Sequence, residues 1–231
     1  MKFKSFIVSI CLIIIGCKSN THYNSKISQL EEASIIDLVP NSQKKGMQWL
    51  LKNMDKDDKN LLSTSFLIDN CNYAYEAWDS TPWGSVDDSL FFEYILPFSS
   101  LNERRDNWRQ DFYERFFPIV KNAKSASEAA AILNNNIFEM VGVIYSTKRP
   151  KADQSPYESI EAGLASCTGL SFMLIDACRS VGIPARFVGT PMWYNNSGNH
   201  SWVEIWDNGW HFTGAFEPTG ERLNEGWFAS L

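Results

Sequence analysis

The sequence is poor in histidine and lacks the spacings with which proteins usually hold a metal ion or a phosphate group. Three histidines and five cysteines occur in 231 residues, and they form neither a His-x-x-x-His nor a Cys-x-x-Cys pair. A Gly-x-Gly-x-x-Gly motif and a phosphate-binding loop are also missing. These absences argue against metal-dependent and nucleotide-dependent enzymes, so we expect no metal site and no cofactor.

Positive charge is scarce as well. Lysine and arginine together number 21 against 27 aspartates and glutamates, which gives a formal net charge of -6 and a pI near 5.1. Proteins that bind nucleic acid neutralise phosphates with a surplus of basic side chains, and no basic block reverses the balance locally. Nucleic acid is therefore not an expected partner.

Long apolar runs are missing too. The run at residues 6–16 is about 11 residues long, which is too short to span a bilayer comfortably, and it follows the basic start at residues 1–4. Such a segment is typical of an export signal. Its end, Ile-Ile-Gly-Cys17, resembles the lipobox of bacterial lipoproteins, in which the cysteine is lipidated after cleavage.

The resemblance implies that residues 1–16 are a signal peptide, that Cys17 is a lipid anchor, and that the polar residues 17–28 are a tether. An ordinary secretory signal, in which Cys17 is incidental, is the alternative, and both interpretations export the protein. Lys18 is not the aspartate associated with retention at the inner membrane. We therefore expect a location at the outer membrane or cell surface.

Three cysteines remain for the exported body: Cys71, Cys167 and Cys178. A disulfide between Cys71 and Cys178 would leave Cys167 free, but buried unpaired thiols are equally compatible with the sequence. Cys167 and Cys178 are poor partners for each other, since 11 residues on one helix separate them by roughly 16 Å.

The first part of the chain has the periodicity of helices. The Ser125 to Glu128 segment matches a capping box, which favours a helix start there. Trp78, Trp83 and Trp108 lie in these patterns, and we assign them to the core. We expect a helical N-terminal region over residues 29–124 and a second unit over 125–231. The expected helices cover residues 42–54, 61–77, 87–95, 105–120 and 125–141.

The second part mixes helix and strand. Residues 168–181 predict an amphipathic helix with Gly182 at its C-terminal end, and residues 185–189 predict a strand. Residues 201–206 and 210–213 predict a hairpin around Asn208-Gly209, because Asn-Gly between two β-prone runs is a strong hairpin signal. The fold class is therefore α+β.

This pattern brings a thiol, an imidazole and a carboxylate together. Cys167 lies in the first turn of the predicted helix, where the helix dipole favours a thiolate, and His200 begins the strand expected to face it. An imidazole there can pair with the thiolate and later protonate a leaving amine. Glu217 is the best placed carboxylate to orient that imidazole, and His211 is the other candidate.

The order of these residues resembles the transglutaminase-like core, which transglutaminases, peptide:N-glycanases and many bacterial thiol hydrolases share. The resemblance covers roughly residues 125 to 220. It rests on Cys167 before a helix, Gly-Ile-Pro-Ala-Arg186-Phe-Val, His200-Ser-Trp-Val-Glu, Gly-Trp210 and Glu217-Pro-Thr.

The resemblance implies a papain-like core with a nucleophile-bearing helix and an antiparallel sheet, on which the helical N-terminal region packs. In the family the counterparts of Cys167 and His200 are the nucleophile and the acid/base, and an aspartate usually completes the triad. Here the third residue is Glu217, seven residues after Trp210, which is further than the family spacing. Arg186 is expected to be structural and paired with a carboxylate.

The residues around His200 are candidates for the substrate cleft. Trp193, Tyr194 and Asn199 lie in the loop before His200, and Trp202 follows it; exposed aromatic side chains in such a loop can line a binding site. We expect an exported thiol enzyme that acts on amide bonds of proteins or peptides through a cysteine thioester, by hydrolysis or by transglutaminase-type acyl transfer, with cell-wall peptide as one candidate substrate. The alternative is an inactive binding module for a peptide or a glycan at the cell surface.

Overall fold

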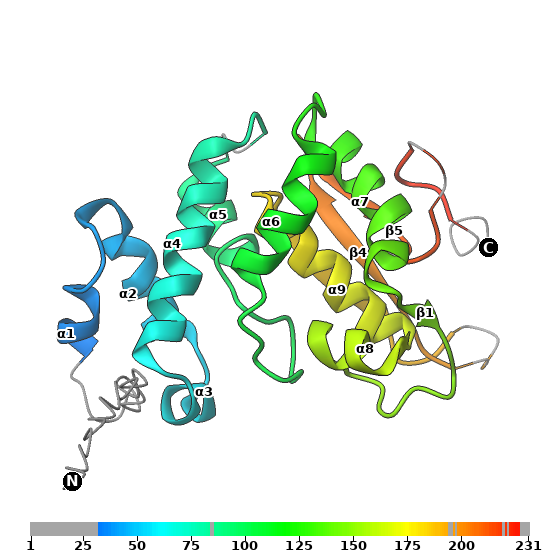
Figure 1. Ribbon diagram of the computed structural model, residues 1–231, viewed down its shortest axis with the longest axis horizontal. Helices are drawn as coiled ribbons and strands as arrows, with labels where there is room; N and C mark the ends of the chain where they lie inside the picture. The colour runs from blue at the N-terminus through cyan, green and yellow to red at the C-terminus, as the bar shows by residue number, and fades with distance from the viewer. Residues whose placement is uncertain are drawn as a thin grey trace, which may run out of the picture.

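The computed structural model describes residues 32–83, 86–193, 196, 198–218, 220 and 222–226. The helices at residues 32–94 lie at one end of the molecule, and the later helices and the sheets lie at the other (Figure 1). None of the helices in the described ranges is long and apolar enough to cross a membrane. The predicted signal peptide, Cys17 and the tether lie outside the described residues.

The N-terminal region is helical, as predicted. Ser63 and Asp87 accept the Phe66 and Leu90 backbone N–H groups with their side chains, and these caps fix the starts of two of its helices. The predicted helices at 42–54, 61–77 and 87–95 are confirmed. Two short helices of five and six residues were missed, because they hold too few turns to show a period. The helices are α1 (Glu32–Ile36), α2 (Lys44–Asn53), α3 (Lys56–Leu61), α4 (Thr64–Ser80) and α5 (Asp88–Tyr94), with a short 3-10 helix at Asn41–Gln43.

Four helices follow. The first lies within the predicted N-terminal range 29–124, but its buried apolar residues belong to the apolar cluster of the second part. The predicted helix at 105–120 begins four residues later, because Arg105 binds Asp58 of α3 and the carbonyl oxygen of Glu103, which holds this segment in a loop. Ser125 caps its helix, but Glu128 reaches the backbone of Lys124, so the predicted capping box is half formed. The helices are α6 (Arg109–Val120), α7 (Ala126–Val141), α8 (Pro156–Ala162) and α9 (Cys167–Ser180).

The unpredicted helix α8 has the complete capping box that was expected elsewhere. Ser155 accepts the Glu158 backbone N–H, and the Glu158 carboxylate accepts the Ser155 backbone N–H. Pro156 occupies the first helical position, where its missing N–H costs nothing. This short signal, Ser-Pro-x-Glu, was readable in the sequence and was overlooked.

The antiparallel sheet has the predicted strands in the order β3–β4–β5. Its strands are β3 (Ala185–Thr190), β4 (His200–Trp206) and β5 (Trp210–Thr213). Asn208 and Gly209 have positive φ in the turn between β4 and β5, as the hairpin requires. A parallel pair of two-residue strands, β1 (Ile144–Tyr145) and β2 (Leu164–Ala165), was not predicted, because two residues cannot show an alternation.

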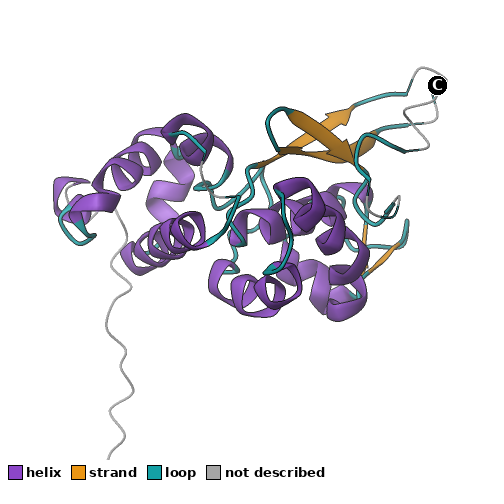
Figure 2. Cartoon of the chain, turned by 90° about the horizontal axis from the view of Figure 1, so that it is seen from above, coloured by secondary structure: helices purple, strands orange, loops and turns teal. Residues whose placement is uncertain are grey.

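The sheet covers one face of the helical layer (Figure 2). Val203 and Ile205 of β4 are fully buried in one apolar cluster with residues of α6, α7 and α9, whereas the alternate residues of β4 are less buried. A second apolar cluster fills the N-terminal region. The α+β fold, with a helical N-terminal region, a helix that begins at Cys167 and an antiparallel sheet, is therefore confirmed.

Two buried arginines join the two parts. Arg109 of α6 and Arg179 of α9 donate to carbonyl oxygens of residues 94–99, at the end of α5 and in the loop after it. The indole N–H of Trp83 also crosses the junction and donates to the Val181 carbonyl oxygen at 2.9 Å. These bonds tie the N-terminal region to the C-terminal end of α9.

The two cysteines expected in the core are not joined by a disulfide. Cys71 and Cys178 are free, fully buried thiols, so the alternative of unpaired thiols holds and the disulfide does not form. Burial raises the pKa of Cys71 to about 12.

Trp108 is buried, and Trp78 and Trp83 pack against the apolar clusters, which confirms their assignment to the core.

Candidate active site

Cys167 is the first residue of α9 and carries a free, partly buried thiol. Ser166 precedes it as the N-cap: its hydroxyl accepts the Gly169 N–H and donates to the Ala152 carbonyl oxygen. The first N–H groups of a helix lack partners within the helix and favour a negative charge nearby. The thiol therefore lies where a developing thiolate or oxyanion would be stabilised.

A contact between side chains brings the start of α9 to the start of β4. The hydroxyl oxygens of Thr168 and Ser201 are 3.2 Å apart. Thr168 follows Cys167 and Ser201 follows His200, so the two predicted catalytic residues are each one residue away from this contact.

His200 is 7% exposed. Burial lowers the pKa of its imidazole below the ordinary value, which is about 6.5. The reason is that protonating a buried ring costs more free energy than protonating an exposed one. A neutral imidazole can accept a proton from a thiol. At neutral pH the site therefore favours a neutral base at rest over a permanent imidazolium.

Glu217 returns to His200 through a turn that follows β5. The Glu217 N–H donates to the Gly214 carbonyl oxygen at 3.1 Å, and Phe216 between them has φ of 65°. One carboxylate oxygen of Glu217 lies 3.9 Å from Nε2 of His200. The turn absorbs the extra residues after Trp210 and explains how the long spacing still brings a carboxylate to the imidazole.

The competing partner, His211, is engaged elsewhere. Its Nε2 lies 3.0 Å from the carbonyl oxygen of Asp207, and its Nδ1 lies 2.8 Å from Nδ2 of Asn224. In the register of the sheet His211 is paired with Ile205, at the far end of β4 from His200. His211 is therefore not the group that orients His200.

Arg186 has the structural role expected for it. Its Nε donates to a carboxylate oxygen of Glu204 on the neighbouring strand at 2.8 Å, and its guanidinium carbon lies 3.9 Å from the centre of the Trp210 ring. The ion pair and the stacked ring stabilise the face of the sheet beyond His200.

Two of the four predicted cleft residues surround His200. The ring centres of Trp193 and His200 are 5.7 Å apart, and those of His200 and Trp202 are 6.2 Å apart. Asn199 is exposed directly before His200, and Tyr194 lies outside the described residues. The imidazole therefore lies among aromatic rings, which contribute to its burial.

Sequence reasoning missed Thr168, Ser201 and Asn134. The contact between Thr168 and Ser201 joins residues 33 positions apart, and no local pattern identifies such a pair. Asn134 gave a clearer signal: it is a polar residue on the apolar stripe of α7, four residues after Ala130 and three before Ile137, both of which are buried.

Residues 115–215 match the model of the transglutaminase-like superfamily. The match begins in α6 and ends in the turn after β5. A comparison with curated protein sequences finds no match. A solved structure from Cytophaga hutchinsonii, of a candidate cysteine protease, is similar at 18% identity with a TM-score of 0.45, and the match covers 62% of this chain and 47% of that chain. The chain thus spans less than half of that structure's length.

Proposed function

We propose that the chain is a thiol enzyme that acts on amide bonds of proteins or peptides through a thioester on Cys167, and the match of residues 115–215 to the model of the transglutaminase-like superfamily supports this. One observation carries the proposal: the contact between Thr168 and Ser201 brings the helix start that holds Cys167 to the strand start that holds His200, and a carboxylate oxygen of Glu217 lies 3.9 Å from His200. A nucleophile, a base and a group that orients the base are the parts that this chemistry needs.

The reaction begins when His200 accepts the thiol proton of Cys167 and the sulfur attacks the amide carbonyl carbon. The carbonyl oxygen becomes an oxyanion, and backbone N–H groups at the start of α9 are candidate donors that would stabilise it. His200 then gives its proton to the leaving nitrogen, the carbon–nitrogen bond breaks, and a thioester remains on Cys167. Water or an amine then attacks the thioester carbon while His200 accepts its proton. The carbon–sulfur bond breaks, and His200 returns the proton to the sulfur of Cys167.

Glu217 acts in this scheme through His200. When the imidazole accepts the proton, it becomes positively charged, and a carboxylate 3.9 Å from Nε2 stabilises that charge more than it stabilises the neutral ring. The contribution is therefore greatest at the stages in which His200 is protonated. The glutamate takes the role that an aspartate usually has in this family.

Hydrolysis is the reaction we propose for the thioester, because transfer to an amine requires a site that excludes water. The proposed substrate is an amide of a protein or of a cell-wall peptide. We further propose that the signal peptide exports the chain and that a lipid on Cys17 anchors it to the cell envelope, which would bring the site to such substrates.

A trapping experiment tests this proposal. The protein is incubated with a library of peptide amides and quenched in acid, and the peptide that contains Cys167 is weighed by mass spectrometry. We expect an added mass equal to the acyl part of a substrate, together with release of the amine, and neither in Cys167→Ala. Turnover by folded Cys167→Ala at the wild-type rate would refute the proposal.

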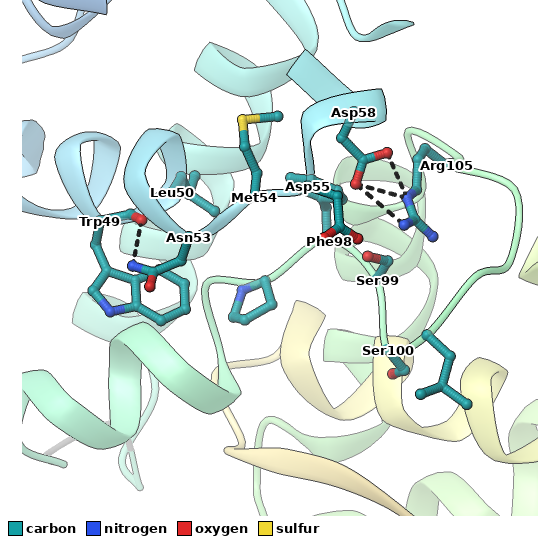
Figure 3. A pocket seen from close by; sticks show the side chains of 12 residues that line it. Trp49, Leu50, Asn53, Met54, Asp55, Asp58, Phe98, Ser99, Ser100 and Arg105 are labelled. Carbon is teal, nitrogen blue, oxygen red and sulfur yellow. Dashed lines mark hydrogen bonds and ion pairs between the residues drawn. The ribbon is translucent and has the colours of Figure 1, made fainter. Parts of the chain in front are cut away.

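A binding function has its own supporting observation. A cavity of about 200 Å³ lies in the N-terminal region, between α2 and the loop after α5 (Figure 3). Trp49 and Asn53 lie on one side of it, and Asp58, which binds Arg105, lies on the other. An aromatic ring beside polar groups suits a glycan or a peptide.

This alternative predicts a different outcome in the same assays. A binding module would hold a glycan or peptide with an affinity that falls in Trp49→Ala and is unchanged in Cys167→Ala. It would release no amine from any member of the amide library. Turnover that requires Cys167 would exclude the inactive module.

A further inference from the structure

Asn134 is a buried polar residue at a position where packing in the apolar core does not explain the presence of an amide. It lies in α7 with 3% of its surface exposed, between Ala130 and Ile137 on the helix face that packs into the core. Burying a side-chain amide costs free energy unless its polar atoms are hydrogen-bonded. The bonds that Asn134 makes therefore indicate why an amide is present.

Among the described residues, the side-chain hydrogen bonds of Asn134 go to the segment that leads to Glu217. Nδ2 donates to the hydroxyl of Thr213 at 3.0 Å and to the carbonyl oxygen of Gly214 at 2.8 Å. Oδ1 accepts the backbone N–H of Phe216 at 3.0 Å. One side chain thus binds the turn on both sides, before and after its bend.

The turn has features that need such support. Phe216 has φ of 65°, a conformation that costs free energy for a residue with a bulky side chain. At Gly214, a Cβ would overlap the carboxylate of Glu217, so that carboxylate lies directly against the backbone of the turn. The bend at Phe216 turns the chain back toward β4 and His200. The missing side chain of Gly214 leaves room for the Glu217 carboxylate.

We propose that Asn134 is a positioning residue, which holds the Gly214–Glu217 turn so that the Glu217 carboxylate remains beside His200. The inference rests on the proposed function, since it assigns Asn134 a role in that site. Asn134 lies on α7 and acts through Glu217, so it is not itself a catalytic residue.

A structural role in α7 alone would make a different prediction, and a double-mutant cycle separates the two. The rate of Cys167 alkylation by iodoacetamide is measured at pH 7 in the wild type, Asn134→Ala, Glu217→Ala and the double variant. If Asn134 acts through Glu217, its substitution slows labelling about fivefold or more in the wild type but has no further effect when Glu217 is absent. An equal slowing in both backgrounds would overturn the inference.

Asn136→Ala is the matched control. Asn136 is exposed on the same helix and bonds only to the carbonyl oxygen of Ile132 one turn earlier, among the bonds that the described residues make. Its substitution should leave the labelling rate unchanged. An equal loss in Asn136→Ala would mean that the rate reports the stability of α7 and would also overturn the inference.

A milder change covers the case in which Asn134→Ala fails to fold. Thr213→Val removes one hydroxyl that binds Asn134 and keeps the size of the side chain. It should slow labelling in the same direction, again only when Glu217 is present, and unchanged labelling in folded Thr213→Val would count against the inference.

His200→Ala distinguishes this inference from the proposed function. If His200→Ala does not slow labelling, the proposed activation of Cys167 fails altogether. If His200→Ala slows labelling and folded Asn134→Ala does not, the proposed function stands and the role of Asn134 is refuted.

Discussion

The hydroxyl of Thr168 lies 3.2 Å from the hydroxyl of Ser201, and this contact connects the helix that begins with Cys167 to the strand that begins with His200. Ser201 is buried, at 4% exposure. Elsewhere α9 and β4 share an apolar interface. The hydrogen bond between the two hydroxyls joins α9 and β4 at the end that holds Cys167 and His200.

Thr168→Val should therefore slow the alkylation of Cys167. Valine has the shape of threonine without the hydroxyl, so the Ser201 hydroxyl loses its partner, and we expect a loss of about 1 kcal/mol in the free energy of unfolding. Thr190→Val is the control, because that hydroxyl donates to the Met192 carbonyl oxygen in an exposed turn. Equal labelling rates in the two variants would contradict the role of the contact.

Glu217→Gln should lower the pKa of His200 further. Burial already lowers it, and the carboxylate 3.9 Å away favours the protonated ring, so its removal acts in the same direction as burial. The three histidines of the chain make this measurable by NMR titration of the imidazole signals. Glu225→Gln, at a carboxylate that pairs with Arg222, is the control and should leave His200 unchanged.

Gly214→Ala should have the same effect as Glu217→Gln on the His200 titration. The added Cβ overlaps the Glu217 carboxylate and must displace it. The φ of Gly214 is not in the positive range, so alanine adds no backbone strain and the effect is steric. A wild-type titration curve in Gly214→Ala would show that Glu217 does not influence His200 from this position.

Asp176→Asn should stabilise the protein at neutral pH. Asp176 is 1% exposed in α9, and neither carboxylate oxygen has a hydrogen-bond partner among the described residues. Burial raises its pKa well above the ordinary value, although Arg179 and Arg109 act against this shift.

The sign of the effect follows from proton binding. The unfolded carboxyl group ionises near about pH 3.9, while the folded one keeps its proton to higher pH. Stability is thus lost as the pH rises between these two values, and Asp176→Asn should remove that loss in thermal unfolding at pH 4 and pH 7. Asp57→Asn, on exposed α3, is the control. A less stable Asp176→Asn at both pH values would mean that Asp176 is ionised and balances the buried arginines.

Much of the second part of the fold was predictable because its signals are local. The Asn208-Gly209 turn, the apolar period before Gly182 and the alternation around Val203 each lie within a short window. Helices with few turns and strands of two residues carry no such period, which is why α3 and β1 were missed.

The candidate site was predictable to a lesser extent. Cys167 and His200 could be chosen because each starts an element that the sequence indicates. Glu217 could be named as a carboxylate, but the turn at Phe216 that returns it to His200 depends on Asn134, which is 82 residues away from Phe216. Contacts of this kind arise from tertiary packing, and they produce no regular pattern of residues that could be recognised in the sequence.

The alkylation of Cys167 tests the central claim most directly, because it requires no substrate. Rate constants with iodoacetamide at pH 7 are compared for the wild type, His200→Ala and His211→Ala, with the buried Cys71 and Cys178 as markers of intact folding. We predict that labelling slows about tenfold or more in His200→Ala and is unchanged in His211→Ala. Equal rates in all three folded proteins would mean that His200 does not activate the thiol, and would contradict the account.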